Sequence, residues 1–285
     1  MKLRVALLGT RGIPNYYGRS EQISEYVSAG LVKRGHEVTV YNTHSHPYTA
    51  GSWNGVEIRC CYEPGYLPGI FGQFIYELNC LLDARKRNYD VIMLMDYSRN
   101  SLWGRLYPPK SAIITHMGGL EWKREKYTRP VMAFMRYAEK MAVKHSQYYV
   151  VNSMLRQTCL QDKYHIESKY IPYGADLFFE MGWREQFDRS EVFRDDYFLL
   201  MPGTAPQHKP FHKSVIDTDA FYPSSASEVR YLVETMQRME IEKRMVNNDL
   251  KKLKDQFNWE TIVDRYEEFL LDCYYNYNLG RAIYY

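Results

Sequence analysis

The segment from Gly9 to Gly18 has the residue types of a phosphate-binding loop. It follows an apolar run, Val5–Leu8, and carries glycines at positions 9, 12 and 18. Glycine lets the backbone turn sharply and approach a ligand without a Cβ in the way. A helical pattern begins directly after the loop, so backbone N–H groups and a helix N-terminus can face a phosphate. Glycines also occur at such turns for packing alone; as ligand-binding candidates we take Gly12, Gly18 and the permanent charge of Arg11.

The second expected strand argues against a dinucleotide site. Such a site places Asp or Glu at the end of the second strand, where it binds the ribose hydroxyls. Here the strand Glu37–Tyr41 continues into Asn42, Thr43 and His44, so the carboxylate is missing. NAD is therefore disfavoured, and a nucleotide-binding Rossmann protein of other chemistry is the weaker alternative.

The composition is typical of a cytoplasmic globular protein. The chain has 285 residues, of which 45% are hydrophobic and 25% charged. A net charge of +3 is too small to indicate a nucleic-acid partner. The five cysteines lack the spacing of a metal site, so we expect reduced thiols. The sequence shows neither a signal-peptide pattern nor an apolar run near the ~20 residues that span a bilayer.

The first 175 residues alternate strand and helix patterns. Strands are expected at Arg4–Gly9, Glu37–Tyr41, Val56–Cys61, Asp90–Met95, Ser111–Thr115, Gln147–Val151 and Lys169–Pro172. Helices are expected at Ser20–Arg34, Gly72–Arg87, Arg129–Lys144 and Met154–Lys163. This order predicts an α/β fold with a doubly wound parallel sheet. Ligands bind beyond the carboxyl ends of such strands, where three segments would gather: Thr10–Gly18, Asp96–Asn100 and His116–Arg124.

The second half lacks this regularity. A strand is expected at Tyr197–Met201, but Pro202, Pro206 and Pro210 exclude a helix directly after it. Helical patterns resume at Ser225 and continue to Cys273. One or two strands do not make an independently stable sheet. The second half therefore looks incomplete.

Four motifs, in family order, resemble those of the family 4 glycosyltransferases. They are the opening loop, Gly119–Arg124, Ala142–Ser146 and Ile171–Ala175. Within the family the chain looks most like bacterial rhamnosyltransferase-type enzymes of cell-surface polysaccharide assembly. The resemblance implies the GT-B architecture, in which two Rossmann-like domains face each other across a cleft. The first domain holds the acceptor and the second holds the nucleotide-sugar donor.

The resemblance also implies three parts of the chain. These are an acceptor-type domain (1–175), a truncated donor-type domain (176–257), and a closing helix with a tail (258–285) that packs back on the first domain. The family pattern passes from Tyr197–Met201 directly to Pro210–Val215, so the middle of the donor domain, with its nucleotide pocket, is absent. A complete Rossmann-like domain needs on the order of 150 residues, more than remain after residue 175.

The remaining site candidates come from the same resemblance. His116 would lie near the reacting sugar, where it hydrogen-bonds hydroxyls or shares developing charge; a capping or loop histidine is the alternative. Arg19 replaces a usual glycine and either clamps a donor phosphate or blocks its approach. Glu21 orients a sugar hydroxyl or only complements the helix dipole. One further segment either contacts the acceptor, with its tryptophan ring stacked on a sugar, or is an ordinary charged turn. Its residues are Glu121, Trp122, Lys123 and Arg124.

Two classes of function follow from these expectations. The first is a glycosyltransferase that moves a sugar from a UDP- or dTDP-sugar to a saccharide or polyprenyl-linked acceptor, with no metal and no cofactor. The second is a catalytically inactive remnant that acts as a binding or scaffold subunit. The aromatic loop Gly65–Phe74 and the basic helix Arg129–Lys144 suggest contact with the inner face of the cell membrane. A core helix with a solvated basic face explains the second feature equally well.

Overall fold

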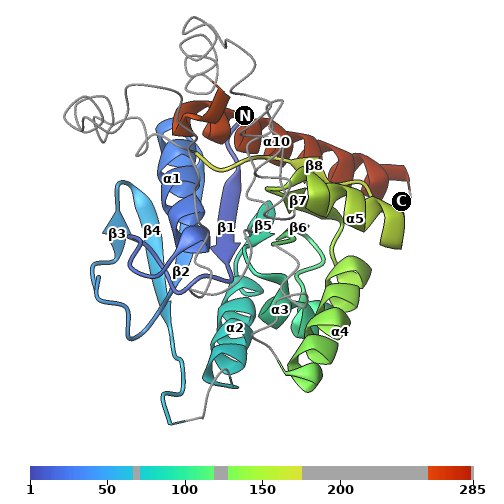
Figure 1. Cartoon of the computed structure of the whole chain (residues 1–285). Helices are drawn as coiled ribbons and strands as arrows, with labels where there is room; N and C mark the ends of the chain where they lie inside the picture. Colours follow the sequence, from blue (N-terminus) through green and yellow to red (C-terminus); the bar gives the residue numbers. More distant parts are fainter. Residues whose placement is uncertain (67–70, 119–127, 175–255, 284–285) are drawn as a thin grey trace, which may run out of the picture. The chain divides into compact units, whose positions relative to one another are not determined.

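The central feature is a mostly parallel sheet of eight strands (Figure 1). The computed structural model describes residues 1–66, 71–118, 128–174 and 256–283. The strand order is β3-β4-β2-β1-β5-β6-β7-β8, and only the β3–β4 pair is antiparallel in this sheet. The predicted α/β fold with a parallel sheet is confirmed. The strands are β1 (Arg4–Leu8), β2 (Glu37–Thr43), β3 (Ser52–Trp53), β4 (Val56–Cys61), β5 (Val91–Leu94), β6 (Ala112–His116), β7 (Tyr148–Val151) and β8 (Lys169–Tyr170).

The helices connect successive strands, as the alternating sequence pattern predicts. Those in the described residues are α1 (Arg19–Lys33), α2 (Phe71–Ala84), α3 (Tyr97–Asn100), α4 (Arg129–His145), α5 (Met154–Tyr164) and α10 (Trp259–Ile283), with a 3-10 helix η1 (Ser101–Leu106). The short α3 and η1 were not predicted. In addition, α10 continues to Ile283, well beyond the Cys273 at which the sequence pattern ended.

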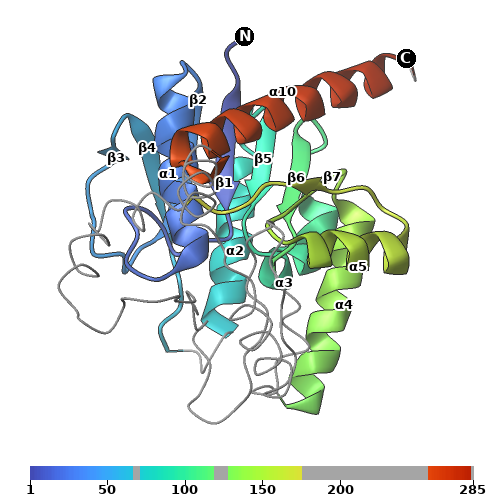
Figure 2. The ribbon, with the colours of Figure 1, turned by 45° about the horizontal axis from the view of Figure 1, so that its top comes forward.

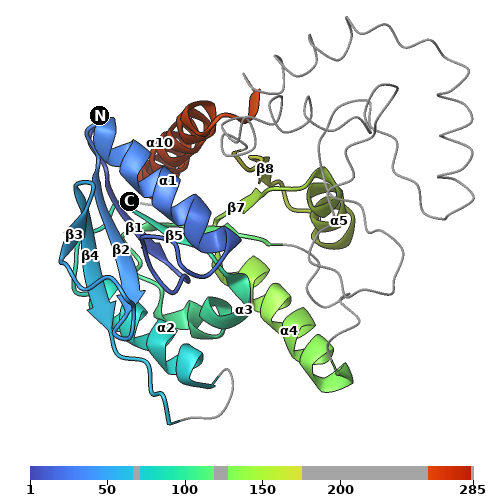
Figure 3. The same cartoon turned by 60° about the vertical axis from the view of Figure 1, so that its left-hand side comes forward.

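Helices cover both faces of the sheet (Figure 3). In β1, Val5 and Leu7 pack into the apolar cluster that includes α1 and α10. Ala6 and Leu8 point to the other face, where they meet the cluster that includes α2. Strands buried on both faces must be continuously apolar, and this is why these runs could be recognised in the sequence.

The register brings the carboxyl ends of the central strands to one edge. Within β1, Leu7 lies opposite Val40 of β2 and Met93 of β5, all three in parallel ladders. The loops that leave β1, β5 and β6 therefore begin side by side, next to α2 and α3 (Figure 1). This is the edge at which parallel α/β sheets bind ligands.

Helix α10 crosses the α1 face of the sheet, although the two helices are far apart in the sequence (Figure 2). The ring of Trp259 stacks on Tyr26 of α1, with ring centroids 4.3 Å apart and planes 2° from parallel. A Cβ on Gly30 would lie 2.6 Å from a methyl group of Val263, so the close approach of the two helices requires glycine there. The two helices are thus fitted to each other by shape.

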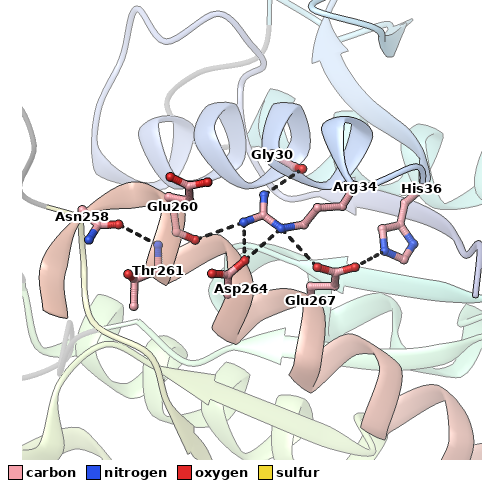
Figure 4. Close-up of polar contacts among 8 residues, drawn as sticks. All are labelled: Gly30, Arg34, His36, Asn258, Glu260, Thr261, Asp264 and Glu267. Atoms are coloured by element: carbon pink, nitrogen blue, oxygen red, sulfur yellow. Dashed lines mark hydrogen bonds and ion pairs between the residues drawn. The ribbon is translucent and has the colours of Figure 1, made fainter. Parts of the chain in front are cut away.

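A polar cluster closes the same α1–α10 contact (Figure 4). Arg34 follows α1, and its guanidinium binds the carboxylates of Asp264 and Glu267 on α10. The same group donates to the carbonyls of Gly30 and Glu260. Glu267 also pairs with Nε2 of His36 at 2.9 Å. Arg34 is therefore the centre of the polar contacts that hold α10 against α1.

Part of the predicted second half lies outside the described residues. This applies to the expected strand Tyr197–Met201, to the helical patterns from Ser225 to Asp255, and hence to all but the last two residues of the predicted donor-type domain. The division at residues 175 and 257 stays a prediction. Among the helices of the described ranges, none is long and apolar enough to cross a bilayer.

Candidate functional site

The glycine loop after β1 is held in one conformation by Asn42. Gly12 has φ +129°, a backbone conformation that favours glycine, and a Cβ there would overlap the side chain of Asn42. The Asn42 amide accepts from the N–H of Ile13 at 3.0 Å and donates to its carbonyl at 2.8 Å. Sequence analysis noted Asn42 only as a missing carboxylate, and its role in fixing the loop was not foreseen.

Two acidic side chains of α1 also bind the loop backbone. Glu21 accepts from the N–H of Arg11 at 3.2 Å, and Glu25 accepts from the N–H of Asn15. The side chain of Asn15 in turn accepts from the N–H groups of Tyr17 and Gly18. One oxygen of Glu21 thus fixes the loop, and the proposed contact with a sugar hydroxyl would fall to the other.

The loop leads into an N-terminus of α1 suited to an anion. Gly18 caps the helix without a side-chain hydrogen bond, so the first N–H groups are open to a ligand. The guanidinium of the exposed Arg11 lies 5.3 Å from the ring centroid of Tyr17. Arg19 is exposed and makes no ion pair with any described residue. Two permanent positive charges therefore flank this helix end.

His116 ends β6 at the same edge of the sheet. Its side chain is 3% exposed, and its Nε2 has no hydrogen-bond partner among the described residues. Burial lowers the pKa of His116 to about 4, although the nearby charge of Asp96 acts in the opposite direction. The imidazole is therefore neutral at pH 7. In this form it can donate a hydrogen bond to a hydroxyl group or accept one from it.

An ion pair lies between His116 and the loop. Asp96 follows β5 and caps α3 by accepting from Ser98 at 2.8 Å. Its other oxygen binds Arg99 at 2.6 Å, and Arg99 donates to Gln73 of α2 at 2.5 Å. Burial would raise the pKa of Asp96, but Arg99 and Ser98 hold it below its usual value. Asp96 is thus an ionised, fixed acceptor.

Several buried polar atoms at this edge have no partner among the residues that the structure describes. They are Oγ1 of Thr10, both carboxyl oxygens of Glu77, Oγ of Ser101 and Nε2 of His116. Buried polar groups are normally hydrogen-bonded, so such a group of exceptions indicates a place for water or for a ligand. Sequence analysis missed Glu77 and Arg99; the only available signal was an acidic residue within the apolar pattern of α2.

The structure brings together some of the predicted site residues. Gly12, Gly18, Arg11, Arg19 and Glu21 belong to one loop and helix start, and His116 ends a strand of the same edge. The acceptor candidates Glu121, Trp122, Lys123 and Arg124 lie outside the described residues, and their roles stay predictions.

Two comparisons concern the sequence itself. Residues 100–176 match the family model of a domain of unknown function, DUF1972. A comparison with curated proteins gives no match. Neither result assigns an activity.

Comparison with solved structures shows the fold. Sucrose-phosphate synthase from Thermosynechococcus elongatus is similar with a TM-score of 0.52 and 14% identity, over 65% of this chain and 52% of that chain. HepE of Anabaena, solved with UDP and glucose, has a TM-score of 0.41 and 14% identity, over 65% of this chain and 50% of that one. The chain spans about half the length of these structures. The likeness to the synthase, together with the parallel sheet, confirms a GT-B-like fold.

Proposed function

We propose that the chain is a glycosyltransferase that moves a sugar from a UDP- or dTDP-sugar to a saccharide or polyprenyl-linked acceptor. The observation that carries this proposal is the carboxyl edge of the sheet. There a fixed glycine loop, an open helix N-terminus with Arg11 and Arg19, and the neutral His116 lie on adjoining elements. These groups suit a substrate that combines a diphosphate with hydroxyl groups.

The chemistry would depend on positioning and on fixed charges. The N–H groups of the loop, the start of α1 and the two arginines would stabilise the negative charge that develops on the leaving diphosphate. His116 would hydrogen-bond a hydroxyl of the sugar through Nε2. Holding the acceptor hydroxyl in line with the breaking bond would supply the rest of the rate acceleration. No metal is needed in this scheme.

The narrower assignments belong to the same proposal. By resemblance, the activity is rhamnosyl or hexosyl transfer in cell-surface polysaccharide synthesis, at the cytoplasmic face of the membrane. Exposed basic residues of α4, among them Lys140 and Lys144, and the exposed Tyr66 and Phe71 are available for contact with an anionic leaflet. We also propose that residues 176–257 form a truncated donor-type domain.

A second function is favoured by one observation. Because the sequence passes from Tyr197–Met201 directly to Pro210–Val215, without the nucleotide pocket that the resemblance implies, a catalytically inactive binding or scaffold subunit is the alternative. Such a subunit would keep the acceptor side of the fold and would bind no donor.

Calorimetric titration with UDP- and dTDP-sugars tests the proposal. We expect saturable binding for at least one donor, weakened roughly tenfold or more in Arg19→Ala, because a charge-assisted hydrogen bond contributes about 1.5–3 kcal/mol. Lys33→Ala is the matched control, since Lys33 is exposed at the opposite end of α1. Absence of heat with every donor favours the scaffold function. Equal losses in the two variants contradict the assigned role of Arg19.

A further inference from the structure

Glu77 is a buried acid that forms no salt bridge within the described part of the chain. It lies on α2, is 0% exposed, and neither carboxyl oxygen has a hydrogen-bond partner among the described residues. An unpaired buried carboxylate is very costly, whereas a neutral carboxylic acid is far less so. The cation that interacts with Glu77, Arg99, is already held by Asp96 and Gln73. The surroundings therefore favour the protonated form of Glu77.

The charged and titratable groups around Glu77 support this view. Burial raises the pKa of Glu77 to about 8; Arg99 opposes this effect and Asp96 adds to it. The amide of Asn100 favours ionisation and Glu63 disfavours it. Three further groups that interact with Glu77 are neutral at pH 7, since burial raises their pKa values: Tyr76, Cys80 and Tyr107.

Asn100 connects Glu77 to the glycine loop. The nitrogen of its side-chain amide lies only 2.6 Å from where a Cβ on Gly9 would be, so the amide packs directly beneath the loop. The same nitrogen donates to the carbonyl of Asp96 at 3.1 Å. Unpartnered hydroxyls of Thr10 and Ser101 lie next to these residues in the chain. A negative charge on Glu77 would therefore change the electrostatic potential at the base of the glycine loop.

We propose that Glu77 is a positioning residue of the candidate site: its carboxylic acid stays neutral in the packing beside the glycine loop, and its ionisation opposes the binding of an anion there. This inference rests on the proposed function and adds to it a reason for pH dependence. A second negative charge beside Asp96, shielded from water, repels a diphosphate at the loop. The acid form adds no such charge to oppose the positive charges of Arg11 and Arg19.

The first test is the pH dependence of UDP-glucose binding, measured by calorimetry. For the wild type we expect the affinity to fall roughly tenfold from pH 7 to pH 9, as linkage to a group that titrates near the middle of this range requires. Glu77→Gln keeps a neutral side chain of the same shape, so its affinity should change much less. Glu167→Gln, which removes an exposed carboxylate, should follow the wild type. Equal falls in wild type and Glu77→Gln overturn the proposal.

A second test needs no ligand and separates the two hypotheses. The folded protein binds a proton at Glu77 that the unfolded chain releases above its ordinary pKa of 4.5, so stability should decrease as pH rises from about 4.5 to 8. Urea unfolding should show a shallower decrease in Glu77→Gln than in the wild type. If none of the UDP- and dTDP-sugars binds, the proposed function fails, while parallel unfolding curves overturn the role of Glu77. Should the variant not fold, infrared spectroscopy of the wild type decides: a protonated-carboxyl band that disappears near pH 8 supports the proposal, and its absence overturns it.

Discussion

At the scale of single residues, the site depends on how Gly12 and Asn42 fit together. Gly12 has a positive φ, and the side chain of Asn42 fills the space that any other side chain would need. The two hydrogen bonds from Asn42 to Ile13 require this close approach. The loop is thus preorganised by a neighbouring strand rather than by its own glycines alone.

Gly12→Ala should therefore both destabilise the protein and weaken donor binding. We expect a loss of about 1–3 kcal/mol in the free energy of unfolding, from the strained backbone and the displaced amide. Urea denaturation and calorimetry measure the two effects. Gly51→Ala is the control, because a Cβ at Gly51 meets nothing within 4 Å and its change should stay within about 0.5 kcal/mol. A Gly12→Ala protein with wild-type stability and affinity would contradict the close fit.

At the scale of elements, the α1–α10 contact joins segments far apart in the sequence. Arg34 binds two carboxylates and one carbonyl across this contact, while the stacked rings of Tyr26 and Trp259 supply the apolar part. Because the site begins at the start of α1, the position of this helix matters for function as well as for stability.

Arg34→Ala should lower the free energy of unfolding by about 1–3 kcal/mol, the range for removing a partner of charged groups that are partly buried. Its side chain is 21% exposed, so solvent screening keeps the loss below that of a fully buried pair. Lys33→Ala, one residue earlier and exposed, should change stability by less than about 0.5 kcal/mol in the same urea experiment. Equal effects of the two substitutions would show that the polar cluster adds nothing to the contact.

The elements also show what the sequence reveals and what it leaves hidden. Val56–Cys61 was predicted with the bounds of β4, because an apolar run between turn residues has few other interpretations. By contrast, α3 and η1 are too short to show a helical period in the sequence, and α3 depends on the cap at Asp96. The two-residue β3 exists only through its pairing with β4.

The residues of the candidate site also differ in whether the sequence predicts them. The glycine loop and His116 follow from local pattern and from the resemblance, and the structure places both at the carboxyl edge. Glu77 could not be assigned, because one acid in a helix is normally on the surface, and its burial depends on the packing of α2 against α3, η1 and the sheet. Asn42 depends likewise on contact between a loop and a neighbouring strand.

At the scale of the whole molecule, residues 1–174 and 257–285 belong to one compact unit. This unit carries the candidate anion site, although the GT-B scheme assigns the donor to the second domain. We therefore predict that the carboxyl edge of this sheet takes part in donor binding itself, whatever residues 176–257 contribute.

The most direct test of this claim is an amide chemical-shift titration of the full chain with UDP-glucose. We predict that the largest shifts fall on the loop from Gly9 to Gly18, on the first turn of α1 and at His116. Shifts confined to the amino-terminal edge of the sheet, around Glu37 and Glu57, or no shifts at all, would contradict it.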